Sequence, residues 1–143
     1  MDKKKMTEEN KDCIFCKIVK GEIPAVKVYE DEKVIAIPDI NPYAKGHIMV
    51  IPKEHSRWVW NMKKEEYIYL MEKVKYLAEV LRKAFNVEWI EEVIAGIGVP
   101  HTHIHLLPRK ENDGLGEVPT KPLDPKPTEQ EQKKIIEKIK ENL

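Results

Sequence analysis

The sequence is poor in cysteine, in aromatic residues and in long apolar runs. Its 143 residues include two cysteines and 7% aromatic side chains. No apolar run approaches the ~20 residues that a membrane-spanning helix needs. The lysines near the start have no apolar stretch behind them, which does not match a signal peptide. We therefore expect a cytoplasmic protein that does not enter a membrane.

A surplus of charge of either sign is also lacking. The 25 basic and 25 acidic side chains cancel. A neutral chain gives no electrostatic reason to bind a polyanion, so we expect no nucleic-acid partner. A small anionic ligand stays open, because it needs only a local cluster of donors. The length suits one domain, and the 41% of hydrophobic residues are enough to form its core.

Hydrophobic periodicity predicts strands and helices that are segregated along the chain. The clearest helix covers residues 64–85, where apolar side chains recur at helical spacing. The expected strands cover residues 26–30, 33–37, 47–51, 92–95 and 103–107. This order is typical of an α+β domain with an antiparallel sheet.

The last part of the chain begins with turn-forming residues. Prolines recur between Asn112 and Pro127, which predicts an extended linker. Thr128 and Glu131 then form a capping-box signature for a final helix that ends near Asn142. We expect three regions, namely a disordered charged tail over 1–11, a folded domain over 12–110, and the linker with its helix over 111–143.

Three of the five histidines alternate over residues 101–105. Alternate residues of a strand share a face, so His103 and His105 point one way and Ile104 points into the core. His101 joins that face unless Pro100 turns it aside. Such a trio favours a metal site or catalysis over an exposed surface. In catalysis a neutral imidazole attacks phosphorus while a neighbour holds its tautomer or donates to a phosphate oxygen. The residues alone leave both readings open.

The two cysteines, Cys13 and Cys16, form a Cys-x-x-Cys pair. Without a signal peptide, a structural disulfide is not expected. The spacing indicates a redox pair or half of a metal site, and two free buried cysteines are the third reading. No βαβ pattern surrounds the pair, which disfavours a thioredoxin-like redox role.

Several ordered blocks resemble the histidine triad (HIT) family. The family signature alternates three histidines with apolar residues, and residues 101–107 match it with Thr102 as the one polar exception. Further blocks match in the same order, at residues 13–24, 28–32, 38–42 and 46–55. The resemblance extends from Asp12 to Arg109 and is nearest to the branch that hydrolyses purine nucleoside phosphoramidates. It implies a HIT-like fold with a five-stranded antiparallel sheet, one long helix and short flanking helices.

The resemblance implies roles for the histidines of the triad. His103 would attack the α-phosphorus and form a nucleotidyl-histidine, from which water would release the nucleoside monophosphate. His105 would contact a phosphate oxygen and help to protonate the leaving group. His101 would belong to the same catalytic triad, and His47 would lie beside the phosphate.

The resemblance also implies a nucleotide-binding set. Asp39 would accept hydrogen bonds from the ribose hydroxyls, although its setting between prolines also suits a plain turn residue. Backbone N–H groups of Gly98 and Val99 would bind phosphate oxygens as a small anion nest. The residues that match the base pocket, or that form ordinary core, are Phe15, Ile18, Ile23, Ile37 and Ile40.

Some members of the family that carry Cys-x-x-Cys hold a zinc ion, and their other ligands match His55 and His101. With Cys13 and Cys16 this makes two thiolates and two imidazoles, which suit a closed tetrahedral structural site. His101 would then serve the metal and leave the other two histidines of the triad for chemistry. We therefore expect structural Zn²⁺ and no cofactor for catalysis.

The sequence departs from the family pattern before the triad. The usual Ala-Gly-Gln-x-Val reads Ala-Gly-Ile-Gly-Val over 95–99, so Ile97 replaces a glutamine that helps to position the phosphate. Residues 91–94 also lack the usual Asn-Gly element. These departures affect the expected rate and leaving group. They keep two alternatives open, a dinucleoside polyphosphate hydrolase and a non-catalytic zinc-containing nucleotide-binding module.

The resemblance further implies a homodimer joined across the long helix, with Tyr67, Tyr69 and Tyr76 at or near the interface. Trp58 and Trp60 follow His55 and suit the core, a dimer contact or a wall for the substrate. The expected partners are therefore a purine nucleotide and a second copy of the chain.

Overall fold

The computed structural model describes residues 12–143, so the tail expected over 1–11 lies outside the described residues. Its elements are α2 (Ile14–Val19), β1 (Tyr29–Glu30), β2 (Val34–Pro38), β3 (Ile48–Pro52), a 3₁₀ turn (Val59–Asn61), α3 (Lys64–Phe85), β4 (Trp89–Val93), β5 (Ile104–Arg109) and α4 (Glu129–Lys140). Across residues 12–143, no helix combines the length and the apolar character that crossing a membrane requires.

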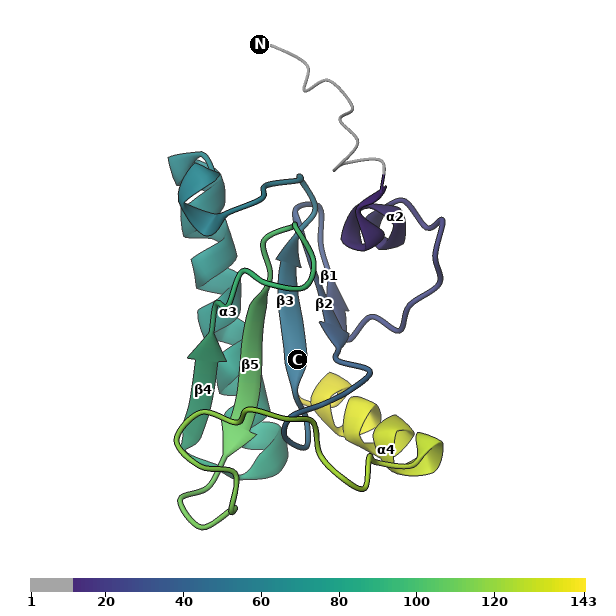
Figure 1. Ribbon diagram of the computed structural model, residues 1–143, viewed down its shortest axis with the longest axis vertical. Helices are drawn as coiled ribbons and strands as arrows, with labels where there is room; N and C mark the ends of the chain where they lie inside the picture. Colours follow the sequence, from purple (N-terminus) through teal and green to yellow (C-terminus); the bar gives the residue numbers. More distant parts are fainter. Residues whose placement is uncertain (1–11) are drawn as a thin grey trace.

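The strands form one antiparallel sheet of five strands in the order β1-β2-β3-β5-β4 (Figure 1). This arrangement confirms the predicted α+β class. β5, which carries His105, lies between β3 and β4, so its register is set on both sides. Met49 of β3 and Val93 of β4 both pair with His105.

Most predicted strand boundaries are wrong by one to three residues, and β1 covers only the end of the strand predicted over 26–30. Two of the differences, at β4 and β5, have a clear physical reason. β4 begins at Trp89 rather than at Glu92, because Trp89 pairs with Arg109. β5 also continues beyond its expected end at Leu107 and passes through Pro108. At that position only β4 flanks the strand, since pairing with β3 ends at Leu106. A proline is tolerated there because no partner on the other side requires its missing N–H.

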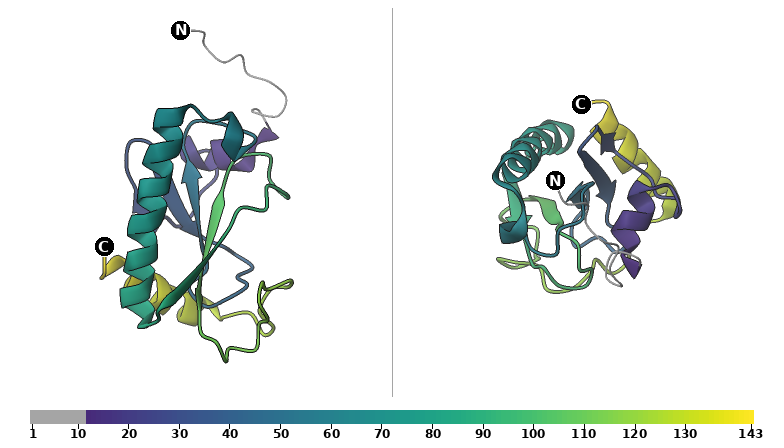
Figure 2. Two further views of the ribbon diagram at one scale, coloured as in Figure 1. Left: turned by 90° about the vertical axis from the view of Figure 1, so that its left-hand side faces the viewer. Right: turned by 90° about the horizontal axis from the view of Figure 1, so that it is seen from above.

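The helices cover both faces of the sheet (Figure 2). α3 runs along one face, and its boundaries confirm the helix predicted over 64–85. Ile139 of α4 is fully buried in the same core, so the C-terminal helix docks beside α3. The predicted capping box is confirmed, since the Thr128 side chain accepts from Glu131 N–H and the Glu131 side chain from Thr128 N–H. α2 packs on the opposite face.

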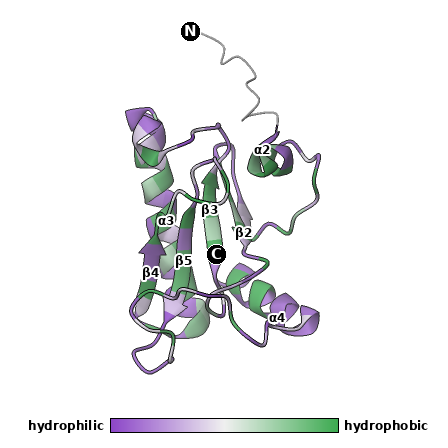
Figure 3. Ribbon diagram, viewed as in Figure 1, coloured by the Kyte–Doolittle hydropathy of each residue, from purple (hydrophilic) through white to green (hydrophobic). Residues whose placement is uncertain are grey.

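The alternation of side chains on β5 separates the core from the chemistry. Ile104 and Leu106 are fully buried in the core beneath α3. His105 therefore points to the opposite face, the face that α2 covers. Figure 3 shows that apolar residues gather in the central strands, which lie between these helices. The prediction that His103 and His105 share a face away from the core of Ile104 agrees with this arrangement.

A buried guanidinium ends β5. Arg109 is 2% exposed and forms ion pairs with Glu91 at 2.6 Å and with Asp113 at 2.7 Å. It also donates to the backbone carbonyls of Gly116 and Glu117. The guanidinium thus ties the segment after β5 to the edge of the sheet.

Asp113→Ala should lower the free energy of unfolding by about 2–3 kcal/mol, because it leaves a buried guanidinium with one carboxylate partner instead of two. Urea denaturation followed by circular dichroism measures the loss. The matched control is Glu79→Ala, which breaks an exposed ion pair with Lys75 and should cost less than about 0.5 kcal/mol. Equal losses in the two variants would contradict the anchoring role of Arg109.

Candidate functional site

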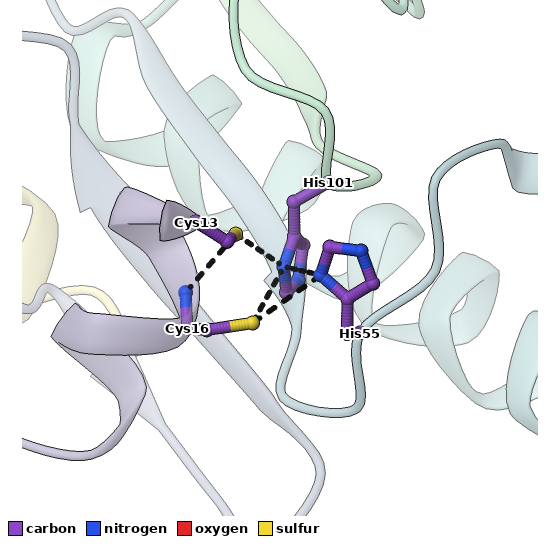
Figure 4. A group of neighbouring side chains, drawn as sticks. All are labelled: Cys13, Cys16, His55 and His101. Carbon is purple, nitrogen blue, oxygen red and sulfur yellow. Dashed lines mark hydrogen bonds between the residues drawn. The ribbon is translucent and has the colours of Figure 1, made fainter. Parts of the chain in front are cut away.

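The structure brings the four predicted metal ligands together from separate segments. We call Cys13, Cys16, His55 and His101 the metal cluster (Figure 4). Cys13 is the N-cap of α2 and accepts from Cys16 N–H at 3.3 Å. One helical turn therefore places both sulfurs on the same side. His55 follows β3 and His101 precedes β5, and both rings point at the sulfurs.

The spacing of the donor atoms fits a tetrahedral metal ion. Sγ of Cys13 is 3.2 Å from Nδ1 of His101, and Sγ of Cys16 is 3.3 Å from Nδ1 of His55. The two Nδ1 atoms are 3.2 Å apart. Zinc bonded to two sulfurs at ~2.3 Å and two nitrogens at ~2.0–2.1 Å would separate such donors by ~3.3–3.8 Å. The four side chains could therefore hold a metal ion of this kind with small adjustments.

The protonation of His101 also suits a metal ligand. Its Nε2 lies 2.8 Å from the Pro52 carbonyl oxygen, which can only accept a hydrogen bond. Nε2 therefore carries the ring proton, and the lone pair of Nδ1 faces the sulfurs. A backbone acceptor of this kind commonly orients metal-binding histidines.

The middle histidine of the triad is buried and oriented by the backbone. His103 is 5% exposed and lies just before β5. Its Nδ1 is 2.7 Å from the carbonyl oxygen of His101, so Nδ1 carries the proton and Nε2 holds the lone pair. The ring of Phe15 meets the His103 ring edge-on at 5.2 Å. A neutral imidazole held this way has one nitrogen ready to act as a nucleophile.

A chain of hydrogen bonds sets the tautomers of the next two histidines. Tyr43 N–H donates to Nδ1 of His47 at 3.0 Å, so the proton of His47 is on Nε2. That nitrogen lies 2.9 Å from Nδ1 of His105, which must accept. The proton of His105 is therefore on Nε2, where it can be donated to a ligand.

Asp39 completes this second group. Asp39 N–H donates to the His47 carbonyl, and Oδ2 of Asp39 lies 3.7 Å from Nε2 of His47. Asp39, His47 and His105 are close enough to hold an ion. The proton on Nε2 of His47 argues against this, because a ligating nitrogen must offer a lone pair. The group is better described as a hydrogen-bonded network.

Burial keeps both histidines of this network neutral. It lowers the pKa of His47 to about 4, against an opposing effect of Asp39 and with a smaller contribution from His105. Burial also lowers the pKa of His105, and His103 adds to that shift. At neutral pH each ring therefore has one donor and one acceptor nitrogen, as the hydrogen bonds require.

The residues predicted for the base pocket do not all lie together. Phe15, Ile18 and Ile37 are buried in one apolar cluster with the cysteines, and Ile23 packs against it. Ile40 is 77% exposed and lies outside the hydrophobic clusters of the described residues. Oδ1 of Asp39 also accepts from Asn41 N–H at 2.9 Å, as in an ordinary turn. The core reading and the turn reading of these positions therefore both have support.

The loop before the triad is braced by an aromatic stack. Trp58 stacks on Trp60 with centroids 5.0 Å apart, and the Arg57 guanidinium lies 3.7 Å from the Trp58 ring centre. Arg57 also donates to the Gly96 carbonyl. Gly96 has a φ of 72°, and a Cβ there would lie 2.8 Å from the Trp58 ring. Trp58 therefore packs against the loop before the triad. Its position in the sequence left open whether it belongs to the core, a dimer contact or a wall for the substrate.

Two further parts of the predicted phosphate-binding loop face outward. Gly98 is exposed with a φ of 96°, a value that favours glycine. Ile97, the departure from the family pattern, is 73% exposed. Val99 packs partly into the apolar cluster around α2.

Sequence reasoning missed three contacts that shape the site. Thr102 donates to the Ser56 carbonyl through both its N–H at 2.7 Å and its hydroxyl at 2.9 Å. The only signal for this was a polar residue at an apolar position of the signature. The Tyr43 N–H and the Arg57 contact to Gly96 had no signal, because backbone partners are set by the fold.

Comparisons with known proteins agree with this geometry. The family model described as HIT domain matches residues 20–112. An uncharacterized HIT-like protein of Methanocaldococcus jannaschii is 45% identical over 120 residues, which cover 78% of this chain and 93% of the relative. An adenosine 5′-monophosphoramidase of Schizosaccharomyces pombe is 38% identical over 131 residues, which cover 90% of this chain and 98% of the relative.

Solved structures show the same fold. A HIT-like protein from Bartonella henselae aligns with a TM-score of 0.77 at 34% identity, covering 92% of this chain and 97% of its own. A zinc-bound histidine triad family protein from Mycobacterium smegmatis aligns with a TM-score of 0.77 at 27% identity, covering 93% and 94%. The family match, the named enzyme among the relatives and the shared fold confirm the prediction of a HIT-family enzyme. The chain belongs to the HIT domain family.

Proposed function

We propose that this chain hydrolyses nucleoside 5′-phosphoramidates, with adenosine 5′-phosphoramidate as the model substrate, through a nucleotidyl-histidine on His103. The observation that carries the proposal is the hydrogen bond from Nδ1 of His103 to the His101 carbonyl, which leaves Nε2 as a free nucleophile. The S. pombe relative, named as an adenosine 5′-monophosphoramidase, supports the choice of substrate.

The first chemical step forms a bond between His103 and phosphorus. Nε2 attacks the α-phosphorus while the bond between phosphorus and the leaving nitrogen breaks. A leaving nitrogen that is already protonated in the substrate departs as neutral ammonia and needs no proton from the protein. Nε2–H of His105 would donate to a phosphate oxygen in this step. Full proton transfer from a neutral His105 would leave an imidazolate, so hydrogen-bond donation is the better role than the expected proton transfer.

Water completes the reaction in a second step. It attacks phosphorus, the bond between phosphorus and Nε2 of His103 breaks, and the nucleoside monophosphate leaves as the water proton passes to solvent. His103 thereby returns to its neutral form. The carbonyl of His101 would keep the same tautomer through both steps, so the ring does not need to reorient between them.

His103→Ala should lower AMP release from adenosine 5′-phosphoramidate by ~10³-fold or more, because the attacking nitrogen is lost. The measurement is AMP release by chromatography, with AMP binding measured in parallel by calorimetry. His103→Ala should still bind AMP. Binding by both proteins with release by neither would contradict the phosphoramidate proposal. It would favour the dinucleotide hydrolase or the binding module, the two alternatives that the replacement of the family glutamine by Ile97 keeps open.

We also infer that the metal cluster is a structural zinc site. Two thiolates and two imidazoles match a closed tetrahedral site, and the donor separations support this assignment. The zinc-bound M. smegmatis structure and a zinc-binding protein of Zea mays are relatives of this chain. When bound, the ion would link α2 to the segments before β5 and after β3 without taking part in the reaction.

Cys16→Ser should reduce bound zinc from about one ion per chain to well below that, and it should lower the melting temperature by several degrees or more, because a coordinating thiolate is lost. Atomic absorption and thermal denaturation measure the two effects. Lys20→Ala, at an exposed position after α2, is the control and should change neither. Unchanged zinc content in Cys16→Ser would rule out this ligand set.

The buried neutral state of His47 predicts a loss of stability in acid. Its pKa in the folded chain is about 4, below the ordinary value of ~6.5. The unfolded chain therefore binds a proton first as the pH falls, and stability is lost between pH ~6.5 and ~4. The contribution of His47 should amount to about 2 kcal/mol between pH ~7 and ~5.

His47→Asn tests this, since asparagine does not titrate and keeps an acceptor for Tyr43 N–H. The free energy of unfolding of both proteins is measured by urea at pH ~7 and ~5. Between pH ~7 and ~5, the free energy of unfolding should fall by about 2 kcal/mol less in the variant than in the parent. Effects of acid on the metal cluster cancel in this comparison where the two groups act independently. Parallel pH profiles would contradict the assigned state of His47.

A homodimer is a further proposal, supported by the exposed surface of α3. Tyr67 is 42% exposed, Ile68 46% and Tyr76 38%. Tyr69, expected near the interface, is instead partly buried and donates to Asp31 of the same chain. We therefore place the proposed contact on Tyr67 and Ile68. Tyr76 follows Tyr67 by nine residues, so it projects from the opposite side of the helix and would not share this contact.

A further inference from the structure

The segment that carries the nucleophile lies outside the sheet. β5 begins at Ile104, and its first pairing with β3 is between Ile104 and Val50. Residues 101–103 therefore have no ladder of strand hydrogen bonds to hold them. Their position depends on other contacts, and most of these lead to the metal cluster.

His101 links the two sites within one residue. Its ring belongs to the metal cluster through Nδ1, which lies 3.2 Å from Sγ of Cys13. Its carbonyl oxygen is the acceptor for Nδ1 of His103 at 2.7 Å. Any rotation of the His101 backbone that follows loss of its ring contacts would also move this acceptor.

The other two ligand segments also touch residues 101–103. Phe15 lies between Cys13 and Cys16, and its ring meets the rings of His101 at 5.8 Å and His103 at 5.2 Å. Ser56 follows the ligand His55 and accepts two hydrogen bonds from Thr102. A metal ion in the cluster would thus hold the surroundings of His103 from two sides.

We propose that the metal ion of this cluster keeps His103 in its nucleophilic tautomer, with His101 acting as the positioning residue. When the ion is bound, the His101 carbonyl stays in place and the proton of His103 stays on Nδ1. Without the ion the carbonyl moves and the proton of His103 divides between Nδ1 and Nε2, so the lone pair needed for attack is present on Nε2 in only part of the molecules. Metal loss therefore slows the chemistry while the nucleotide still binds.

The direct test reads the ring nitrogens of His103. The full chain is labelled with ¹⁵N-histidine and compared with zinc bound and after removal by a chelator, with circular dichroism used to check that it stays folded. Long-range ¹H–¹⁵N spectra separate protonated from unprotonated ring nitrogens, and His103→Asn assigns the signals. The zinc-bound protein should show only the Nδ1–H form of His103, and the folded zinc-free protein should show a mixture. An unchanged pattern would overturn the proposal.

Two variants separate metal control from general loosening. Ile139→Ala opens the core beneath α3 and should leave the His103 pattern intact despite lower stability. A mixture of tautomers in zinc-bound Ile139→Ala would overturn the proposal. Thr102→Val removes the hydroxyl bond to Ser56 and keeps all four ligands, so it remains informative if the zinc-free chain unfolds. Loss of the Nδ1–H form in zinc-bound Thr102→Val would assign the control to Thr102 instead of the metal.

The kinetic readout rests on the proposed function. Zinc removal should slow single-turnover formation of nucleotidyl-His103 by ~10–100-fold, the range typical when the contacts that orient histidines around a metal site are lost. Affinity for AMP should change by less than ~3-fold, and added zinc should restore the rate. An unchanged rate in the zinc-free chain would overturn the proposal. If neither form reacts, the phosphoramidate function fails, and the tautomer comparison still decides the role of the metal.

Discussion

The chemistry proposed for this chain depends on the position of one imidazole proton. A neutral histidine has one nitrogen that donates and one that accepts, and only the second can attack phosphorus. The His101 carbonyl accepts the proton of Nδ1 and leaves Nε2 of His103 free. The chain bends before β5. The main-chain carbonyl of His101 there meets the ring of His103, the next histidine of the triad.

A second set of hydrogen bonds gives His105 its complementary state. Tyr43 N–H determines the tautomer of His47, and His47 determines that of His105. Because burial lowers the pKa of both histidines, neither gains the second proton that would break the order of donors and acceptors. His103 thus offers a lone pair while His105 offers a proton, although both belong to the same short sequence motif.

The two faces of the sheet divide the tasks of stability and function. The face beneath α3 and α4 is filled by aliphatic side chains and forms the main core. The face toward α2 carries a smaller apolar cluster that includes both cysteines. A metal ion there would strengthen the less extensive side of the domain at the place where the reactive histidines need fixed positions. Metal binding and the orientation of His103 share His101, so these two properties are connected through one residue.

The sequence by itself determined the element types, because helical and strand periodicities depend only on the order of apolar residues. It therefore predicted α3 residue for residue and the capping box of α4. It also indicated, through the family resemblance, which four side chains meet in the metal cluster. It failed at Pro108 and Trp89, where the pairing of neighbouring strands decides whether a proline is tolerated and where a strand begins.

Only the tertiary structure decided the state of each histidine. The partners of His47, His101 and His103 are a backbone N–H from Tyr43 and backbone carbonyls from Pro52 and His101. Every residue carries a backbone carbonyl, and every residue except proline carries a backbone N–H, so no side-chain pattern reveals which of them will face an imidazole. The same reason hid the contact of Thr102 with the Ser56 carbonyl. The sequence determined which side chains carry the chemistry, and the fold determined which nitrogen of each ring performs it.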